Sequence, residues 1–457
     1  MIFSSIEFLL WFLPIFLIVY GITPRKYRNL TLLVGSIVFY AMGDVRYLPL
    51  LMISILCNYF LGLHLAKRSP KTLWRKKLLL ILTLGANLAV LLWFKDWGGS
   101  AGLPLGISFY TFQILSYQID VYRGEVSREY SFLKFATYVS MFPKLISGPI
   151  TRYGDISDSL TERTFTVRGL EDGMKLFILG LAAKVLLADR VGILWHEVQV
   201  TGFESISTPL AWLAAIAYSM EIYFDFWGYS LMAMGLGRMM GIELPANFRR
   251  PYMARSVRDF YRRWHMTLGQ WFCRYVYIPL GGSRQGELRT IFNLLVVWML
   301  TGIWHGAGWN FLFWGLWFAF FLILEKLFLG DILESVPKVF GRIYTLAVVL
   351  ISWVFFALES PGEILAYLQA MFGMNRIGPV NSLAMFLCNE YLVLLVIALV
   401  ACLPLGSRLV HALKSSKTGP AMALYRLGEK VIPAVLLLLS VAYIVDASYN
   451  PFLYFRF

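Results

Sequence analysis

Two histidines lie in surroundings where an ionisable side chain needs a chemical explanation. His305 stands within TGIWHGAGWN, residues 301–310, between two long apolar runs, and His265 follows two arginines and a tryptophan in RRWH. A neutral imidazole can take the proton of a hydroxyl while that hydroxyl attacks an acyl carbon, a step worth roughly 10²–10⁴-fold in rate. Buried histidines also make interfacial hydrogen bonds, so neither residue decides the function by itself.

The residues beside His305 suit a narrow site that excludes bulk water, as transfer of a reactive acyl group requires. Glycine lets a second backbone or a substrate approach closely, and three glycines flank the histidine, Gly302, Gly306 and Gly308. Without a role in chemistry, the same glycines would form a turn between two packed helices. We expect the substrate path beside His305 to be lined by Trp304, Trp309 and Asn310.

Two carboxylates occur in a separate apolar run. Glu221 and Asp225 are four residues apart, so on a helix they share one face, and Tyr229 continues that face. Such groups can join neighbouring helices through hydrogen bonds, or they can line an aqueous cavity. A third group that holds the tautomer of an imidazole assists proton transfer. We therefore expect Asp225 and Tyr229 along the substrate path, with Asp225 a candidate to orient His305.

Basic side chains crowd the segment that contains His265. Guanidinium groups bind phosphates through paired hydrogen bonds, which suits the phosphates of coenzyme A or an acidic carrier protein. On a helix within residues 254–281, the same charges would form the polar face of a basic amphipathic helix at a membrane surface. The candidates for binding the acyl donor are Arg249, Arg250, Arg258, Arg262 and Arg263.

The elements that must position these groups are membrane helices. Of the 457 residues, 58% are apolar and 15% are charged, whereas a soluble domain carries roughly 25% charged residues. This composition excludes a disordered chain, a fibrous chain and most soluble enzymes. Long apolar runs without period-two alternation recur from residue 7 to residue 447, so we expect an all-α polytopic membrane protein and not a β-barrel.

Twelve apolar runs approach the ~20 residues that a helix needs to cross a bilayer core. We expect about 11–12 transmembrane helices in one membrane domain over residues 1–457, with a catalytic core in residues 100–330. Segments 131–148 and 254–281 contain lysine, proline or glycine and are expected to be re-entrant or interfacial. The runs lie near residues 6–21, 29–42, 47–66, 77–94, 104–119, 169–190, 208–232, 291–308, 310–329, 343–357, 385–403 and 431–447.

The net charge of +14 comes from 41 Lys and Arg against 27 Asp and Glu. Most of the positive charge falls in short loops between the apolar runs, and basic residues crowd four of these loops, near residues 25–28, 67–77, 249–263 and 408–430. The positive-inside rule places these loops in the cytoplasm and both termini outside. The excess charge is thus explained by topology and by attraction to anionic lipids, and no nucleic-acid partner is expected.

Four scattered cysteines form no C-x-x-C pair, so neither a disulfide framework nor a metal site is predicted. Cys273 lies close to the basic segment and could in principle carry an acyl group. A small buried apolar side chain is the commoner role of a free cysteine, and we expect that role here.

An ordered set of motifs resembles the membrane-bound O-acyltransferase (MBOAT) superfamily, and most of all its bacterial branch of alginate O-acetyltransferase membrane subunits. The resemblance covers nearly the whole chain, because motifs near both ends share it. In chain order the motifs are GISFYTFQILSYQIDVYRG (106–124), MFPKLISGPITRY (141–153), FDFWGYS (224–230), GLGRMMGIELPANFRRPY (235–252), SVRDFYRRWHMTLGQWF (256–272), YIPLGG (277–282), LTGIWHGAGWNF (300–311) and SYNPFLYFRF (448–457).

The resemblance implies a ring of tilted helices around re-entrant segments, with a central tunnel to a buried histidine. His305 matches the catalytic histidine of the family in its W-H-G motif, and His265 matches the second family histidine. The implied reaction moves an acyl group, here an acetyl group, from a cytoplasmic thioester to a hydroxyl outside the membrane. Acetyl-CoA or a carrier-protein thioester would be the donor substrate, and no bound cofactor is expected.

The same resemblance implies a place in the cell and a set of partners. We expect the cytoplasmic (inner) membrane of a bacterium, with the lipid bilayer as the first partner. The acceptor would be a cell-surface polysaccharide or a protein, such as an extracytoplasmic SGNH-type acetyltransferase, and an acyl carrier protein is a further candidate.

Three other functions remain open from the sequence. A related branch transfers D-alanine to teichoic acid from a carrier-protein thioester, although YIPLGGSR (277–284) and the ending NPFLYFRF favour the O-acetylation branch. A transporter or flippase could use a buried histidine as a proton relay, yet transporters tend to hold several carboxylates within the membrane and this chain has one close pair. A structural scaffold for polysaccharide export would tolerate the loss of both histidines.

Overall fold

The computed structural model describes residues 2–65, 73–97, 102–375, 377, 381–416 and 418–446. All regular elements within these ranges are helical, which confirms the predicted all-α class. Parts of the predicted basic loops, at residues 67–71 and 417, and the motif at 448–457 lie outside the described residues.

Seven helical stretches in the described part of the chain are long and apolar enough to cross a membrane. Arg25–Leu65 contains two of the predicted spans, as α2 (Arg28–Asp44) and α3 (Leu48–Leu65). Other predicted runs form helices that are shorter or more polar. The seven stretches are Arg25–Leu65, Leu73–Lys95, Glu287–His305, Trp309–Ser335, Lys338–Ala357, Ser382–Cys402 and Gly419–Asp446.

The helices group into two compact units. The first comprises Met1–Leu181 and Tyr229–Ala246, and the second comprises Ala182–Gly228 and Asn247–Phe457. Along the chain, the division between the units falls at the last residue of α9 (Val167–Ala182) and within α11 (Thr208–Met239).

The first unit is organised around a buried helix, α5. Glycines in the left-handed region bound α5 (Ile107–Arg123), Gly106 with φ 71° and Gly124 with φ 76°, a conformation that favours glycine. The other helices of this unit are α1 (Leu13–Ile22), α2, α3, α4 (Leu73–Leu92), α6 (Phe132–Ser140), α7 (Phe142–Leu145), α8 (Tyr153–Thr161), and parts of α9 and α11.

Segment 131–148 forms the two short helices α6 and α7 and not one continuous span. Ser131 begins α6 by accepting a hydrogen bond from the backbone N–H of Lys134, as N-cap residues do. Lys144 in α7 is fully buried, donates to Gln113 of α5, and lies 4.1 Å from the centre of the Tyr138 ring. The predicted interruption of this apolar segment is therefore present.

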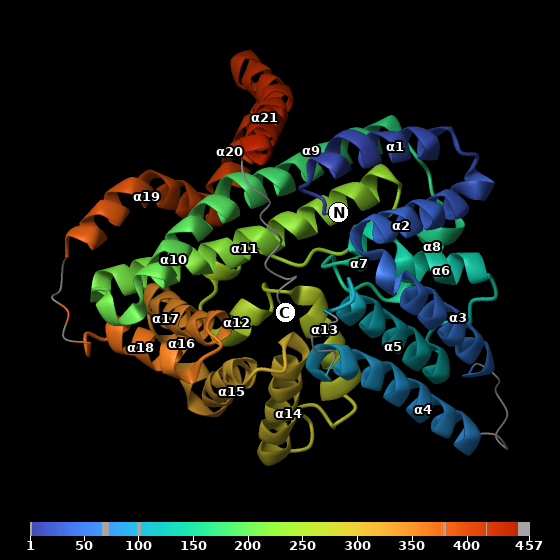
Figure 1. Ribbon diagram of the computed structural model, residues 1–457, viewed down its shortest axis with the longest axis horizontal. Helices are drawn as coiled ribbons and strands as arrows, with labels where there is room; N and C mark the ends of the chain where they lie inside the picture. Colours follow the sequence, from blue (N-terminus) through green and yellow to red (C-terminus); the bar gives the residue numbers. More distant parts are fainter. Residues whose placement is uncertain are drawn as a thin grey trace. The chain divides into compact units, whose positions relative to one another are not determined.

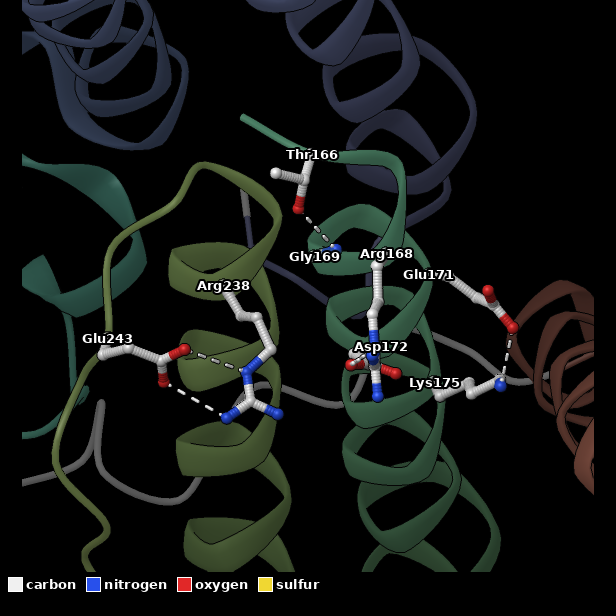
Figure 2. Close-up of polar contacts among 8 residues, drawn as sticks. All are labelled: Thr166, Arg168, Gly169, Glu171, Asp172, Lys175, Arg238 and Glu243. Carbon is white, nitrogen blue, oxygen red and sulfur yellow. Dashed lines mark hydrogen bonds and ion pairs between the residues drawn. The ribbon is translucent and has the colours of Figure 1, made fainter. Parts of the chain in front are cut away.

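Within the first unit, α9 and α11 pack closely because two glycines face each other. A Cβ atom at Gly173 would lie 2.6 Å from the carbonyl oxygen of Gly235, and small residues at such crossings let helix backbones approach. Figure 2 shows the polar contacts near this end of the two helices. Thr166 accepts from the N–H of Gly169 at the start of α9, and Arg238 meets Glu243 through two nitrogen atoms.

The second unit carries His265, His305 and many apolar helices. Its motif segment 254–281 is not one amphipathic helix, since it divides into α12 (Val257–Tyr261) and α13 (Met266–Phe272). The other helices are α10 (Asp189–Thr201), the first part of α11, α14 (Glu287–His305), α15 (Trp309–Leu324), α16 (Gly330–Ser335), α17 (Lys338–Ala357), α18 (Pro361–Met371), α19 (Ser382–Cys402), α20 (Leu405–Ser415) and α21 (Gly419–Asp446).

The helix that ends at His305 packs against the next helix with little space between them. Helices α14 and α15 lie side by side (Figure 1). A Cβ atom at Gly302 would lie 2.5 Å from the carbonyl oxygen of Phe311, and one at Gly315 would overlap the carbonyl oxygen of Trp298. These glycines are required for the contact that fixes the end of α14.

We expect Gly302→Ala to destabilise the protein by about 1–3 kcal/mol, because the added methyl group meets backbone and cannot be accommodated by a side-chain movement. Thermal unfolding in detergent measures this loss. Gly85→Ala is the matched control, since a Cβ atom there meets nothing within 4 Å and alanine favours a helix. Equal midpoints for wild type and Gly302→Ala would contradict the close packing of α14 on α15.

Candidate active site

His305 is the last residue of α14, and aromatic rings hold its side chain. The imidazole is 6% exposed, with ring centroids 4.8 Å from Trp304, 4.9 Å from Trp314 and 5.3 Å from Phe356. The backbone becomes extended at Gly306, where the N–H donates to the carbonyl of Gly302. The end of α14 and the aromatic packing together fix the position of this ring.

His265 occupies the break between α12 and α13. Its backbone lies in the left-handed region with φ 42°, and its ring is 4% exposed. The ring is perpendicular to that of Phe226 at a centroid distance of 4.7 Å, and its Nδ1 lies 3.3 Å from Oδ1 of Asn247. His265 is outside the seven candidate spans, and burial lowers the pKa of its imidazole to about 3, so the ring is neutral at physiological pH.

Both histidines border one cavity of about 400 Å³ in the second unit. Arg258 and Arg262 of the basic segment line the same cavity, and most of its other lining residues are apolar. Trp304 also links the two histidines, because its ring lies 6.1 Å from His265 and 4.8 Å from His305 between centroids. The fold thus brings together the two imidazoles and part of the arginine cluster.

The five predicted donor-binding arginines divide between different places. Arg258 and Arg262 line the cavity with the histidines. Arg250 and Arg263 line a second hollow of about 550 Å³, which they share with Arg255, Arg342 and Arg408. Arg263 is paired with Asp259 at 2.8 Å, and Arg249 lines neither hollow but donates its backbone N–H to the carbonyl of Arg263.

Comparison with known proteins decides the family. The sequence model of MBOAT, the membrane-bound O-acyltransferase family, matches residues 37–361. The chain belongs to this family. It is therefore an O-acyltransferase and a multi-pass membrane protein, and the family chemistry implies a thioester as the acyl donor.

The relatives of this MBOAT protein are bacterial enzymes. It is 37% identical to a protein of Pseudomonas putida described as "Probable alginate O-acetylase AlgI", over the full length of both chains. It is 34% identical to the "Peptidoglycan O-acetyltransferase" of Helicobacter pylori, over 82% of this chain and 81% of that one. A "Teichoic acid D-alanyltransferase" of Streptococcus thermophilus is 28% identical over 49% of this chain and 57% of its own.

In this MBOAT protein the residues expected beside His305 have different positions. Trp304 and Asn310 are buried. Trp309 is 71% exposed at the start of α15 and is not among the residues that line the cavity. Trp314, one and a half turns further along α15, lines the cavity in its place. After the glycine turn, α15 is rotated so that Trp309 is directed outward. The sequence does not reveal this rotation.

Asp225 has a buried partner, Lys184, that was not predicted from the sequence. Its Oδ1 lies 2.8 Å from Nζ of Lys184, and the same lysine lies 2.5 Å from Oδ1 of Asp189. Lys184 stands in the predicted span 169–190, so the cost of an unpaired charge there was a signal that a carboxylate must approach it. A role for Asp225 in orienting His305 stays a prediction.

Tyr229 belongs to the first unit, one turn beyond Asp225 on α11. It is buried, and its ring stacks on that of Phe3 with centroids 4.7 Å apart and planes 16° apart. Its expected place on the substrate path also stays a prediction.

Two further residues concern this region: Glu325, which was not predicted from the sequence, and Cys273, which was expected to be buried. Glu325 accepts hydrogen bonds from the backbone N–H groups of Val257 and Arg258 at 2.6 and 3.0 Å, and a carboxylate is favourable at a helix N-terminus. It therefore fixes the start of α12, the helix that carries Arg258. Cys273 is exposed and lines the cavity, so the expectation that it is buried was wrong.

Proposed function

We propose that this enzyme transfers an acetyl group from a cytoplasmic thioester to a hydroxyl outside the membrane, on a cell-surface polysaccharide or on a protein that modifies it. The observation that supports the proposal is the cavity lined by His265, His305, Arg258 and Arg262. A path that joins a cationic donor site to a buried imidazole suits acyl transfer. Relatives described as alginate and peptidoglycan O-acetyltransferases favour acetyl as the acyl group and a polysaccharide as the final acceptor.

In the proposed reaction, His305 is the general base. Its neutral imidazole takes the hydroxyl proton as the hydroxyl oxygen attacks the thioester carbonyl carbon. A new carbon–oxygen bond forms, the carbon–sulfur bond breaks, and the imidazolium returns its proton to the departing thiolate. The products are an acetyl ester and a free thiol, and the enclosed aromatic walls limit the competing attack by water.

In this proposal the arginines bind the donor, and His265 contacts a substrate without being the base. Arg258 and Arg262 bind phosphates of coenzyme A, or acidic groups of a carrier protein, while the thioester reaches toward His305. An extracytoplasmic SGNH-type acetyltransferase is the proposed first acceptor protein. Arg249, Arg250 and Arg263 extend the cationic surface around the entrance for the donor.

Removal of the cavity arginines is expected to weaken donor binding. For the double variant Arg258→Gln/Arg262→Gln we expect the KM for the thioester donor to rise about tenfold or more, since hydrogen bonds to charged groups contribute about 1.5–3 kcal/mol each. The kcat should change much less. Initial rates against donor concentration measure both constants.

The control for this pair is Arg168→Gln. Arg168 is a highly exposed arginine of α9 whose guanidinium lies 3.9 Å from the carboxylate of Asp172. An exposed pair of this kind contributes little, so the donor KM should stay at the wild-type value. Equal KM values for the double variant and the control would argue against donor binding by these arginines.

The decisive experiment uses purified enzyme in proteoliposomes with acetyl-CoA labelled in the acetyl group. The expected result is release of free coenzyme A together with label in ester linkage to a polysaccharide or to the acceptor protein. A parallel reaction supplies a D-alanyl carrier-protein thioester, because relatives described as teichoic acid D-alanyltransferases make that the second candidate. Turnover of the second donor alone would overturn the acetyl proposal, and transport without thioester cleavage would overturn both.

A further inference from the structure

Residues 247–249, which precede α12, make backbone hydrogen bonds to the residues on both sides of His265. The backbone N–H of Met266 donates to the carbonyl of Asn247 at 2.9 Å, and the N–H of Arg249 donates to the carbonyl of Arg263 at 2.9 Å. These bonds span His265, whose left-handed backbone costs a residue with a side chain roughly 1–2 kcal/mol. The surrounding structure therefore determines this conformation.

The contacts of Asn247 determine which atom of its side-chain amide faces His265. Its Oδ1 lies 3.3 Å from the backbone nitrogen of Thr267 and 2.6 Å from the hydroxyl of Thr267. A backbone N–H can only donate, so the amide atom that faces Thr267 must be the oxygen. The same oxygen lies 3.3 Å from Nδ1 of His265, and Asn247 is 1% exposed.

An acceptor opposite Nδ1 selects the tautomer of the ring. A neutral imidazole carries its proton on one nitrogen and a lone pair on the other. With oxygen facing Nδ1, the proton is favoured on Nδ1 and the lone pair on Nε2, since the hydrogen bond made by one ring nitrogen fixes the state of the other. Free neutral histidine prefers to carry the proton on Nε2. The contact with Asn247 therefore reverses the tautomer preference, and this reversal can be measured.

We propose that Asn247 is a positioning residue that holds His265 as the Nδ1–H tautomer. In the cavity, His265 then accepts a hydrogen bond at Nε2 from an N–H or O–H group of a substrate. As a neutral ring it does not donate to the thioester carbonyl or to the oxyanion that forms from it. This inference rests on the proposed function for its link to acyl transfer, whereas the tautomer itself can be tested without any activity.

Nitrogen-15 NMR of detergent-purified protein with labelled histidine tests the tautomer directly. The chain has five histidines, and the spectrum of His265→Gln identifies the signals of His265 by their loss. We expect the wild-type ring to carry its proton on Nδ1, and Asn247→Ala to shift the population toward Nε2–H. A wild-type ring protonated on Nε2 overturns the proposal, even if Asn247→Ala does not fold or if the enzyme transfers no acetyl group.

A second arm uses the pH profile of acyl transfer. Asn247→Asp keeps an oxygen acceptor but adds a negative charge beside Nδ1–H, which favours the imidazolium and raises the pKa of His265. If activity needs the neutral ring, the acid limb of the profile moves to higher pH. The matched control is Asn293→Asp, a fully buried asparagine that donates to the carbonyl of Gly282 at 2.9 Å, and its acid limb should stay at the wild-type position. The positioning role of Asn247 is refuted if the acid limb of Asn247→Asp stays at the wild-type pH and the tautomer of His265 is unchanged in Asn247→Ala.

Discussion

Replacement of His305 by alanine is expected to lower the kcat of acyl transfer by about 10²–10⁴-fold, the contribution of a well-placed general base. The variant loses the group that removes the hydroxyl proton, while the donor site at Arg258 and Arg262 stays in place. The donor KM should therefore change little. The measurement is the initial rate of ester formation in proteoliposomes, at saturating donor and equal amounts of folded enzyme.

The control for this variant is His196→Ala, which removes an exposed histidine of α10 and should keep the wild-type rate. His305→Gln tests whether a polar side chain of similar size suffices, and we expect it to be as inactive as alanine because an amide is not a base at neutral pH. Near-normal transfer by either His305 variant would show that another group takes the proton. A smaller loss in His265→Ala is expected, because that ring is proposed to contact a substrate without being the base.

The second large effect is expected at the buried lysine of the second unit. Lys184→Met leaves Asp225 without its cation, and the side chains of Lys184 and Asp225 are only 4% and 2% exposed. Breaking a buried ion pair by removing one partner costs about 3–5 kcal/mol, because an uncompensated charge remains. Unfolding in detergent, followed by heat or denaturant, should show a loss of this size.

Two further variants separate a broken charge pair from a simple loss of packing. Lys175→Met is the control, because it removes a partly exposed i,i+4 partner of the exposed Glu171 on α9 (Figure 2) and should change stability by no more than about 1 kcal/mol. The triple variant Lys184→Met/Asp189→Asn/Asp225→Asn removes the cation and both charges, so most of the lost stability should return. Failure of the triple variant to recover would contradict an electrostatic origin.

The sequence predicted the chemical groups of the candidate site better than their arrangement. His265 and His305 stand out because an ionisable group within apolar sequence is costly and must have a purpose, and both line the cavity. The arginines were grouped by their nearness along the chain. Arg258 and Arg262 are four residues apart and line the cavity, whereas Arg263, the next residue, lines the second hollow with Arg250, so neighbours along the chain face different hollows.

Some side-chain partners in the structure could not be predicted from the local sequence pattern. Asn247 lies 18 residues before His265 and Lys184 lies 41 residues before Asp225, and each meets its partner only through the packing of separate elements. Trp309 differs for another reason. The backbone turn at Gly306–Gly308 sets the rotation of α15, and that rotation turns Trp309 outward and Trp314 toward the cavity.

By itself the sequence determined the all-helical membrane class, the approximate positions of many helices and the two histidines, because apolar run length and the cost of buried charge act locally along the chain. The family also followed from the order of the motifs. Only the tertiary structure decided that both imidazoles share one cavity, which arginines reach it, and which side chains hold the buried charges. Those facts depend on close packing between helices distant in sequence, where a few glycines and one strained backbone position set the geometry.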